Sequence, residues 1–304
     1  MTTDTSRPTT TRSGASAHPE QRQRRAVRRH RRRSSLVKHL VLIGACLLMI
    51  YPLVWMVVSS LRPEGEVFRQ SGLLLTDPQP ENYARGWDAL RYPFGHYLLN
   101  SLAVVAFSII GNLVSCSMAA YAFARQNFRG RRLLFAIMLV SIMLPLHVVI
   151  VPQYVLFSSL GWVNTLLPLV LPKFLATDAF FVFLMVQFIR GIPRELDEAA
   201  RIDGAGHVVI FTRIILPLLV PALATTTIFT FIWTWNDFLT PLIYLTSPEA
   251  YTVPVALRSF VDAQGETSWA ALFSMSVVSL LPVFIAFLVG QRLLVKGIAT
   301  TGLK

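Results

Sequence analysis

The chain has 304 residues, of which 54% are hydrophobic and only 14% are charged, and its mean hydropathy is +0.54. Soluble domains carry about 25% charged residues, so this composition argues against an ordinary soluble protein. The net charge of +12 could suggest a nucleic-acid-binding protein, but the positions of the basic residues favour a membrane surface instead.

Residues 1–35 form a polar leader, which we expect to be disordered and cytoplasmic because it contains few apolar residues. Arginine is concentrated between Arg22 and Arg33, directly before the first apolar block. Basic residues that flank a first span orient it with that side in the cytoplasm, and they attract anionic lipid headgroups. We therefore interpret the leader as a topology and lipid-surface anchor and predict no nucleic-acid partner.

Long runs without charge follow the leader. A helix needs about 20 apolar residues to cross the hydrocarbon core, and runs of this length fit helices, which satisfy their own backbone groups in lipid. We predict an all-α integral membrane protein with six transmembrane helices. The predicted spans are about 36–58, 97–124, 131–153, 165–189, 216–246 and 270–292.

The loops support this topology, with both termini in the cytoplasm. The predicted inner loop after the second span holds Arg125, Arg129, Arg131 and Arg132 without any acid. The predicted outer loops, 59–96 and 247–269, are balanced or acidic. An excess of Lys and Arg on the inner side is the pattern that insertion favours.

A charged segment between the fourth and fifth spans predicts a short cytoplasmic helix at about 193–204. Pro193 suits a first helical position, acids follow where the helix dipole favours them, and Gly204 is typical of a helix C-terminus. Asp197 and Arg201 are spaced so that they can pair along the helix. A helix this short is marginal alone in water, so we expect it to dock against another protein.

The same segment resembles the EAA loop of binding-protein-dependent ABC importer permeases. The residues that carry the likeness are Glu198, Ala199, Ala200, Gly204, Ile214, Leu216 and Pro217. The resemblance implies that the segment is a coupling helix, seated in a groove of an ATP-hydrolysing subunit, and that these residues serve the coupling.

Other segments are similar to the carbohydrate branch of these permeases, of the maltose and oligosaccharide type. They are 119–125, 144–145, 235–238, 252–254 and 291–298. The likeness implies a permease domain over 36–304, in which one N-terminal helix precedes a five-helix core at about 94–292, in the cell membrane of a bacterium. It also implies the partners: a second homologous permease, two ATPase subunits and an extracytoplasmic sugar-binding protein.

The sequence lacks the motifs of an ATPase or a metalloenzyme. No G-x-x-x-x-G-K-[ST] phosphate loop is present, and the six histidines are scattered without metal-ligand spacing. We therefore predict a transport subunit and not an enzyme, with no cofactor or metal of its own, while ATP and Mg²⁺ bind to the partner subunits.

Polar and aromatic residues within the later spans are candidates for the solute path, because polar groups in lipid are costly and often functional. They are Lys173, Asp178, Trp233, Trp235, Asn236 and Asp237. Acids and amides can bond sugar hydroxyls, and a Trp ring can stack on a sugar face. The alternatives are an interfacial aromatic belt for the two tryptophans, and mutual neutralisation for Lys173 and Asp178.

Two other functions remain open from the sequence. An importer for another solute, such as a polyol or glycerol-phosphate, fits the same family. An ion-coupled secondary transporter predicts several acids near mid-membrane and inverted repeats, whereas the chain has one candidate acid, Asp178, and no visible repeat.

Overall fold

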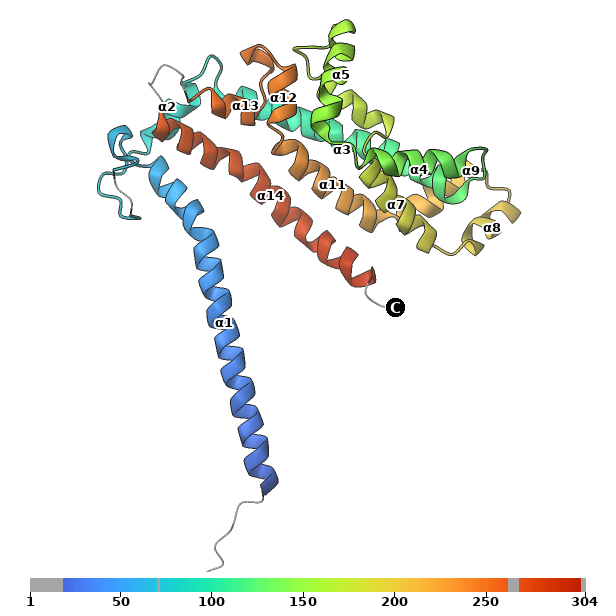
Figure 1. Ribbon diagram of the computed structural model, residues 1–304, viewed down its shortest axis with the longest axis horizontal. Helices are drawn as coiled ribbons and strands as arrows, with labels where there is room; N and C mark the ends of the chain where they lie inside the picture. The colour runs from blue at the N-terminus through green and yellow to red at the C-terminus, as the bar shows by residue number, and fades with distance from the viewer. Residues whose placement is uncertain (1–18, 70–71, 262–267, 302–304) are drawn as a thin grey trace, which may run out of the picture. The chain divides into compact units, whose positions relative to one another are not determined.

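The computed structural model describes residues 19–69, 72–261 and 268–301, and its described part is helical without any strand (Figure 1). The chain divides into two compact units, residues 1–55 and 56–304. The first unit contains most of α1 (Pro19–Ser60), whose segment Val37–Ser60 is apolar and long enough to cross a membrane. Residues 19–35 continue this helix into the leader that the sequence predicts to be disordered, and residues 1–18 lie outside the described part.

The second unit is a bundle of broken helices. In chain order its elements after α1 are η1 (Glu64–Glu66), α2 (Glu81–Asp88), α3 (Phe94–Arg125), α4 (Arg131–Ser141), α5 (Leu146–Ser159), α6 (Leu167–Val170), η2 (Leu171–Leu175), α7 (Ala179–Gly191), α8 (Glu195–Ile202), α9 (His207–Ile210), η3 (Phe211–Ile215), α10 (Leu216–Leu218), α11 (Val220–Trp235), α12 (Leu239–Tyr244), η4 (Pro248–Ala250), α13 (Val253–Arg258) and α14 (Trp269–Thr301).

Four helical segments of the described chain are long and apolar enough to span a membrane: Val37–Ser60, Phe94–Arg125, Leu167–Gly191 and Trp269–Gln291. They agree with four of the predicted spans to within a few residues. A fifth span is available if His207–Leu218 and Val220–Trp235, which meet at 74°, count as one. The predicted count of six is not confirmed.

The predicted span 131–153 is wrong as a single helix. The structure divides this region into α4, which ends at Ser141, and α5, which begins at Leu146. Pro145 lies between them, and proline both lacks an N–H donor and disfavours helical backbone in the residue before it. The fifth predicted span, 216–246, is likewise interrupted, because α11 ends at Trp235.

Helix α3 lies at the centre of the second unit and packs against α7, α11 and η2 (Figure 1). Its Ala120 and Ala124 join the largest buried cluster with Phe181 and Met185 of α7. Small side chains allow helix backbones to approach closely in lipid. At its other end, Phe94 and its neighbours form a second cluster with α13 and α14.

The fourth span is broken between η2 and α7, and nearby hydroxyls compensate the freed carbonyls. Ala176 has a left-handed backbone, with φ 55°. Ser115 Oγ donates to the carbonyl of Lys173 at 2.7 Å, and Thr177 Oγ1 donates to that of Pro172 at 2.8 Å. A break at membrane depth is tolerated where such partners or a water-filled cavity satisfy the backbone.

Candidate functional site

The predicted coupling segment forms the short helix α8. It begins at Glu195 and not at Pro193, which lies just outside the helix. Gly204 ends the segment with φ 82°, a conformation that favours glycine. The Ala205 N–H then donates to the carbonyl of Ala200 at 2.8 Å, which closes the helix in the manner of a Schellman motif.

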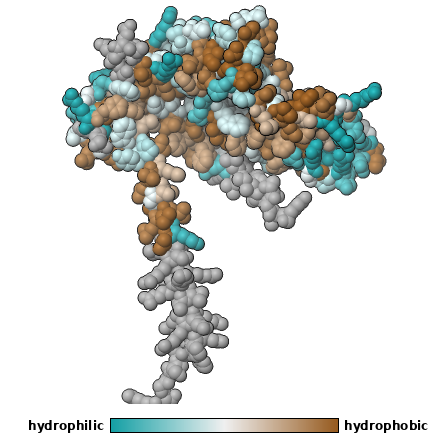
Figure 2. Space-filling view, viewed as in Figure 1, coloured by the Kyte–Doolittle hydropathy of each residue, from teal (hydrophilic) through white to brown (hydrophobic). Residues whose placement is uncertain are grey.

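Most of the predicted coupling residues lie on the surface of this end of the second unit, where Figure 2 shows hydrophilic side chains gathered. Glu198, Ala199 and Gly204 are exposed, Ala200 is half-buried, and nothing lies within 4 Å of a Cβ built on Gly204. The other three predicted residues are on different elements: Ile214 in η3, and Leu216 and Pro217 in α10. The structure thus separates them into an exposed helix and the bend before α11.

Exposed apolar side chains accompany this helix. Ile202, the last residue of α8, is 87% exposed, and Val208 in α9 is 75% exposed. They give the loop an apolar surface beside the charged one.

The predicted pairing of Asp197 with Arg201 is wrong. Asp197 instead pairs with Arg125, at 3.0 Å between Oδ2 and Nε, and both side chains are almost completely buried. Arg201 is exposed. Arg125 was not predicted as the partner of Asp197 because the two residues lie far apart in the sequence.

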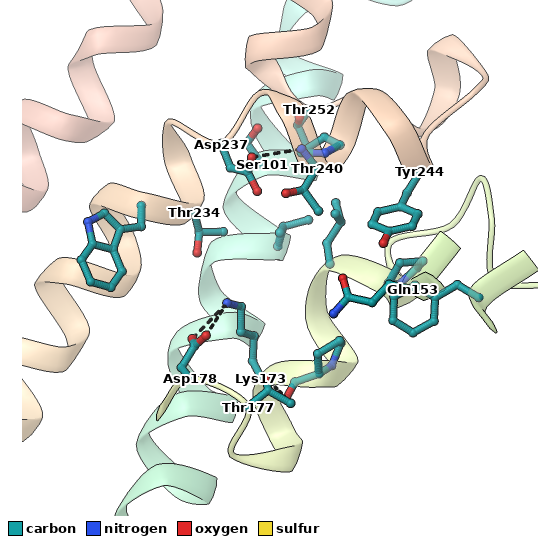
Figure 3. Close-up of a pocket in the computed structure, with 17 residues that line it drawn as sticks. Ser101, Gln153, Lys173, Thr177, Asp178, Thr234, Asp237, Thr240, Tyr244 and Thr252 are labelled. Atoms are coloured by element: carbon teal, nitrogen blue, oxygen red, sulfur yellow. Dashed lines mark hydrogen bonds and ion pairs between the residues drawn. The ribbon is translucent and has the colours of Figure 1, made fainter. Parts of the chain in front are cut away.

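A second candidate site is a cavity of about 290 Å³ in the middle of the bundle (Figure 3). Four of the six residues predicted for the solute path line it: Lys173, Asp178, Trp233 and Asp237. Their contributing elements are η2, α11 and the two turns before α7 and α12. The cavity therefore lies where the fourth and fifth spans are interrupted.

The other two predicted path residues are not in the cavity. The Trp235 ring is 4% exposed, and its Nε1 donates to the carbonyl of Ser279 in α14 at 3.2 Å. The Asn236 amide donates back to the carbonyl of Ile232 at 2.7 Å. Neither side chain is among those that line the cavity.

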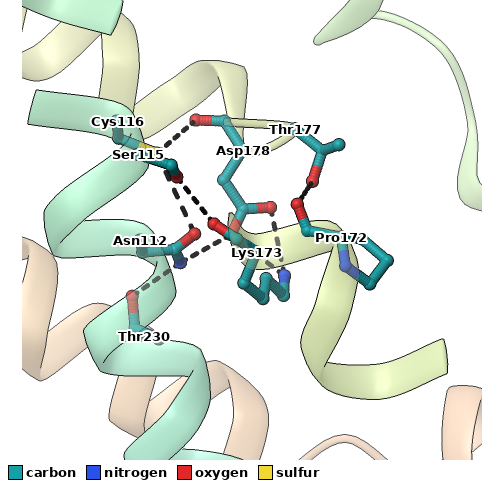
Figure 4. Close-up of polar contacts among 8 residues, drawn as sticks. All are labelled: Asn112, Ser115, Cys116, Pro172, Lys173, Thr177, Asp178 and Thr230. Atoms are coloured by element: carbon teal, nitrogen blue, oxygen red, sulfur yellow. Dashed lines mark hydrogen bonds and ion pairs between the residues drawn. The ribbon is translucent and has the colours of Figure 1, made fainter. Parts of the chain in front are cut away.

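The ion pair of Lys173 and Asp178 closes the break in the fourth span (Figure 4). Lys173 Nζ lies 2.9 Å and 3.1 Å from the two carboxylate oxygens of Asp178. The Asn112 amide in α3 donates to Asp178 Oδ2 at 2.7 Å and to Thr230 Oγ1 in α11 at 3.1 Å. Three spans therefore meet through the Asn112 amide. The side chain of Asp178, which lines the cavity, is 26% exposed.

Several polar cavity residues were missed from the sequence. They are Ser101, Gln153, Thr177, Thr234, Thr240, Tyr244 and Thr252. The Tyr244 hydroxyl and Thr252 Oγ1 are buried and have no hydrogen-bond partner among the described residues. One signal was available, because Thr230 and Thr234 are spaced i and i+4 and thus share one face of α11.

The described part of the chain contains no group of three His, Cys, Asp or Glu that could hold a metal ion. The groups that line the cavity are hydroxyl, amide, ammonium, carboxylate and aromatic ones, which suit a polar organic solute.

Residues 111–296 match the family described as binding-protein-dependent transport system inner membrane component. The chain belongs to this family. The match runs from α3 into α14, so it includes α8 and the Lys173–Asp178 side of the cavity. Together with its apolar helices, membership makes the chain a multi-pass membrane protein.

Two relatives of this inner membrane component are named as sugar permeases. The trehalose/maltose transport system permease protein MalG of Thermococcus litoralis is 34% identical over 276 residues, which cover 90% of this chain and 99% of that protein. The diacetylchitobiose uptake system permease protein NgcG of Streptomyces coelicolor is 32% identical over 88% of each chain.

A solved structure shares the fold of this inner membrane component. It is a bacterial ABC transporter involved in the import of the acidic polysaccharide alginate, with a TM-score of 0.76, 24% identity and coverage of 87% of this chain and 97% of that one.

Proposed function

We propose that this chain is the permease subunit of an ATP-binding-cassette importer for a di- or oligosaccharide. The observation that carries the proposal is the exposed helix α8, which presents Glu198 and Ala199 on the surface and ends at left-handed Gly204. Family membership and the sugar permeases among its relatives support it.

Coupling to ATP hydrolysis occurs through α8 in this proposal. Two ATPase subunits bind ATP and Mg²⁺, and one of them receives Glu198, Ala199, Ala200 and Gly204 in a groove. Ile214, Leu216 and Pro217 contribute by setting the bend that connects this loop to α11. The chain itself hydrolyses nothing and binds no cofactor.

The solute path in this proposal includes the cavity, and a second, similar permease completes it. An extracytoplasmic binding protein delivers the sugar, as the family description implies. Hydroxyl and amide groups such as Thr234 and Gln153 can bond sugar hydroxyls, and the Trp233 ring, which is 50% exposed, can stack on a sugar face. The chain lies in a bacterial cell membrane with both termini in the cytoplasm and has no nucleic-acid partner.

The charge of the cavity favours a neutral sugar over glycerol-phosphate. Lys173 and Asp178 neutralise each other, whereas Asp237 also lines the cavity and forms no ion pair within the described chain. The one unbalanced charge is therefore negative, and like charges repel more strongly where water is partly excluded.

The test is sugar uptake by the complete transporter in proteoliposomes, with Gly204→Leu as the variant. Gly204 has open space within this chain, so we expect the variant to reach the membrane normally and to lose uptake through its clash with the ATPase groove. Gly161→Leu is the matched control, because Gly161 is also left-handed, at φ 68°, with nothing within 4 Å.

Three outcomes would contradict the proposal. Full uptake by Gly204→Leu would refute coupling through α8. Uptake driven by an ion gradient without ATP would favour a secondary transporter. A binding protein that retains a polyol or glycerol-phosphate would refute the sugar assignment.

A further inference from the structure

The ion pair of Arg125 and Asp197 joins three segments at the end of the second unit that carries α8. Arg125 is the last residue of α3, and its Nε lies 3.0 Å from Asp197 Oδ2 in α8. Its Nη2 also donates to the carbonyl of Ile192, just after α7, at 2.7 Å. One guanidinium therefore holds the ends of α3 and α7 against α8.

Both charged side chains are withdrawn from water, with 3% of Arg125 and 6% of Asp197 exposed. Burying charges is costly even when they are paired, and packed apolar residues of similar volume are often as stable or more stable. Stability alone therefore does not explain why two charges occupy this position.

Helix α8 has little else to fix it to the bundle. Asp197 is its only buried residue, while Ala200 is half-buried against the core that includes Ala124. Glu195, Glu198 and the remaining side chains of α8 are exposed. Besides the chain segments that join α8 to α7 and α9, the buried contact through which a displacement of α8 can reach the bundle is that of Asp197.

On the other side of the ion pair, α3 leads to the cavity. It is one unbroken helix of 32 residues without an internal proline. Asn112 lies about 20 Å before Arg125 along the helix axis, from a rise of 1.5 Å per residue. Its amide bonds Asp178 at the cavity wall, and Ser101 of the same helix lines the cavity.

We infer that the Arg125–Asp197 ion pair is the joint that transmits movement of α8 to α3 and, through Asn112, to the Lys173–Asp178 side of the cavity. The inference rests on the proposed function, because α8 moves in this way only if ATPase subunits move it. Arg125 and Asp197 are positioning residues, since neither lines the cavity.

Asp197→Asn tests the joint in the complete transporter, reconstituted with its ATPase subunits and sugar-loaded binding protein. The measured quantities are the amount of assembled complex, the basal ATPase rate and the sugar taken up per ATP hydrolysed. Because the docking surface of α8 is unchanged, we expect normal assembly and basal hydrolysis. The uptake per ATP should fall on the order of tenfold, as expected for two residues that act in one network. Glu195→Gln removes an exposed acid from the same helix and should retain the wild-type ratio.

A double variant, R125Q/D197N, separates a joint from two independent effects. If the residues act as a unit, the double variant loses no more uptake per ATP than Asp197→Asn alone. The inference is overturned if Asp197→Asn keeps the wild-type ratio. It is also overturned if the variant only assembles poorly while its assembled complexes keep that ratio, which would assign the pair to stability. A wild-type transporter without ATP-dependent sugar uptake would instead refute the proposed function, and the inference with it.

Discussion

Gly111 lies where α3 passes closest to the break in the fourth span, and Gly111→Ala tests that contact. An added Cβ would lie 2.8 Å from Phe174 Cδ2, 3.0 Å from the carbonyl carbon of Lys173 and 3.1 Å from its Cβ. Contacts of 3.4–4 Å are ordinary. The Phe174 ring can turn away, whereas the backbone of Lys173 can yield only if η2 moves.

Two opposing contributions determine how far Gly111→Ala changes the free energy of unfolding. Overpacking by one carbon costs about 1–3 kcal/mol, and alanine inside a helix gains about 1 kcal/mol over glycine. The first term should prevail here because two of the three close atoms belong to the backbone or the Cβ of Lys173. We expect Gly111→Ala to lower the free energy of unfolding by about 1–2 kcal/mol.

Thermal unfolding of the purified chain in detergent, followed by tryptophan fluorescence, measures this change. A loss of about 1 kcal/mol lowers the Tm by roughly 2–4 °C in a domain of this size. Gly191→Ala is the control within the same unit, because nothing lies within 4 Å of its added Cβ. If Gly111→Ala unfolds at the same temperature as Gly191→Ala or above it, then η2 does not contact α3 at Gly111 as closely as described.

Two further predictions concern the cavity and the coupling loop. Asp178→Asn leaves Lys173 without its ion-pair partner. Asp178 and Lys173 are 26% and 28% exposed, so the free energy of unfolding should fall by about 1–2 kcal/mol, a value between those of surface and buried pairs. An unchanged Tm would show that the ion pair is fully solvated. Gly204→Ala should retain more uptake than Gly204→Asn, because the smaller side chain clashes less with the ATPase groove. Greater uptake by the asparagine variant, which adopts the left-handed conformation more readily, would show that backbone conformation, and not space against a partner, requires glycine at position 204.

The membrane helices were largely predictable from the sequence, but their breaks were not. Hydropathy reports whether a segment can lie in lipid, and it has the same value for a continuous helix and for two short ones. Proline gives an incomplete signal for the break. Pro145 separates α4 from α5, whereas Pro52, Pro152 and Pro282 lie inside helices, because their neighbours accommodate the missing donor.

The cavity residues were partly predictable, and the errors follow from helix geometry. Trp235, Asn236 and Asp237 are consecutive, so they point in different directions at about 100° per residue and cannot all face one cavity. Asp237 lines it, while Trp235 turns toward α14. Positions spaced by one turn share a face, and α11 carries that pattern in Thr230, which bonds Asn112, and Thr234, which lines the cavity. Spacing is therefore better evidence for a common site than adjacency.

The ion-pair partner of Asp197 is set by the tertiary structure and not by sequence spacing within the helix. The spacing of Asp197 and Arg201 allows a helical ion pair, but exposed pairs of this kind contribute only about 0.3–0.5 kcal/mol. Once packing buries Asp197, an unpaired carboxylate there would cost several kcal/mol. Asp197 therefore requires a cationic partner that is buried with it. Arg125 does so because the fold ends α3 at that point and orients its guanidinium toward both Asp197 and the Ile192 carbonyl. The pair with Arg125, which only the tertiary structure creates, therefore involves a larger free energy than a helical pair with Arg201 would.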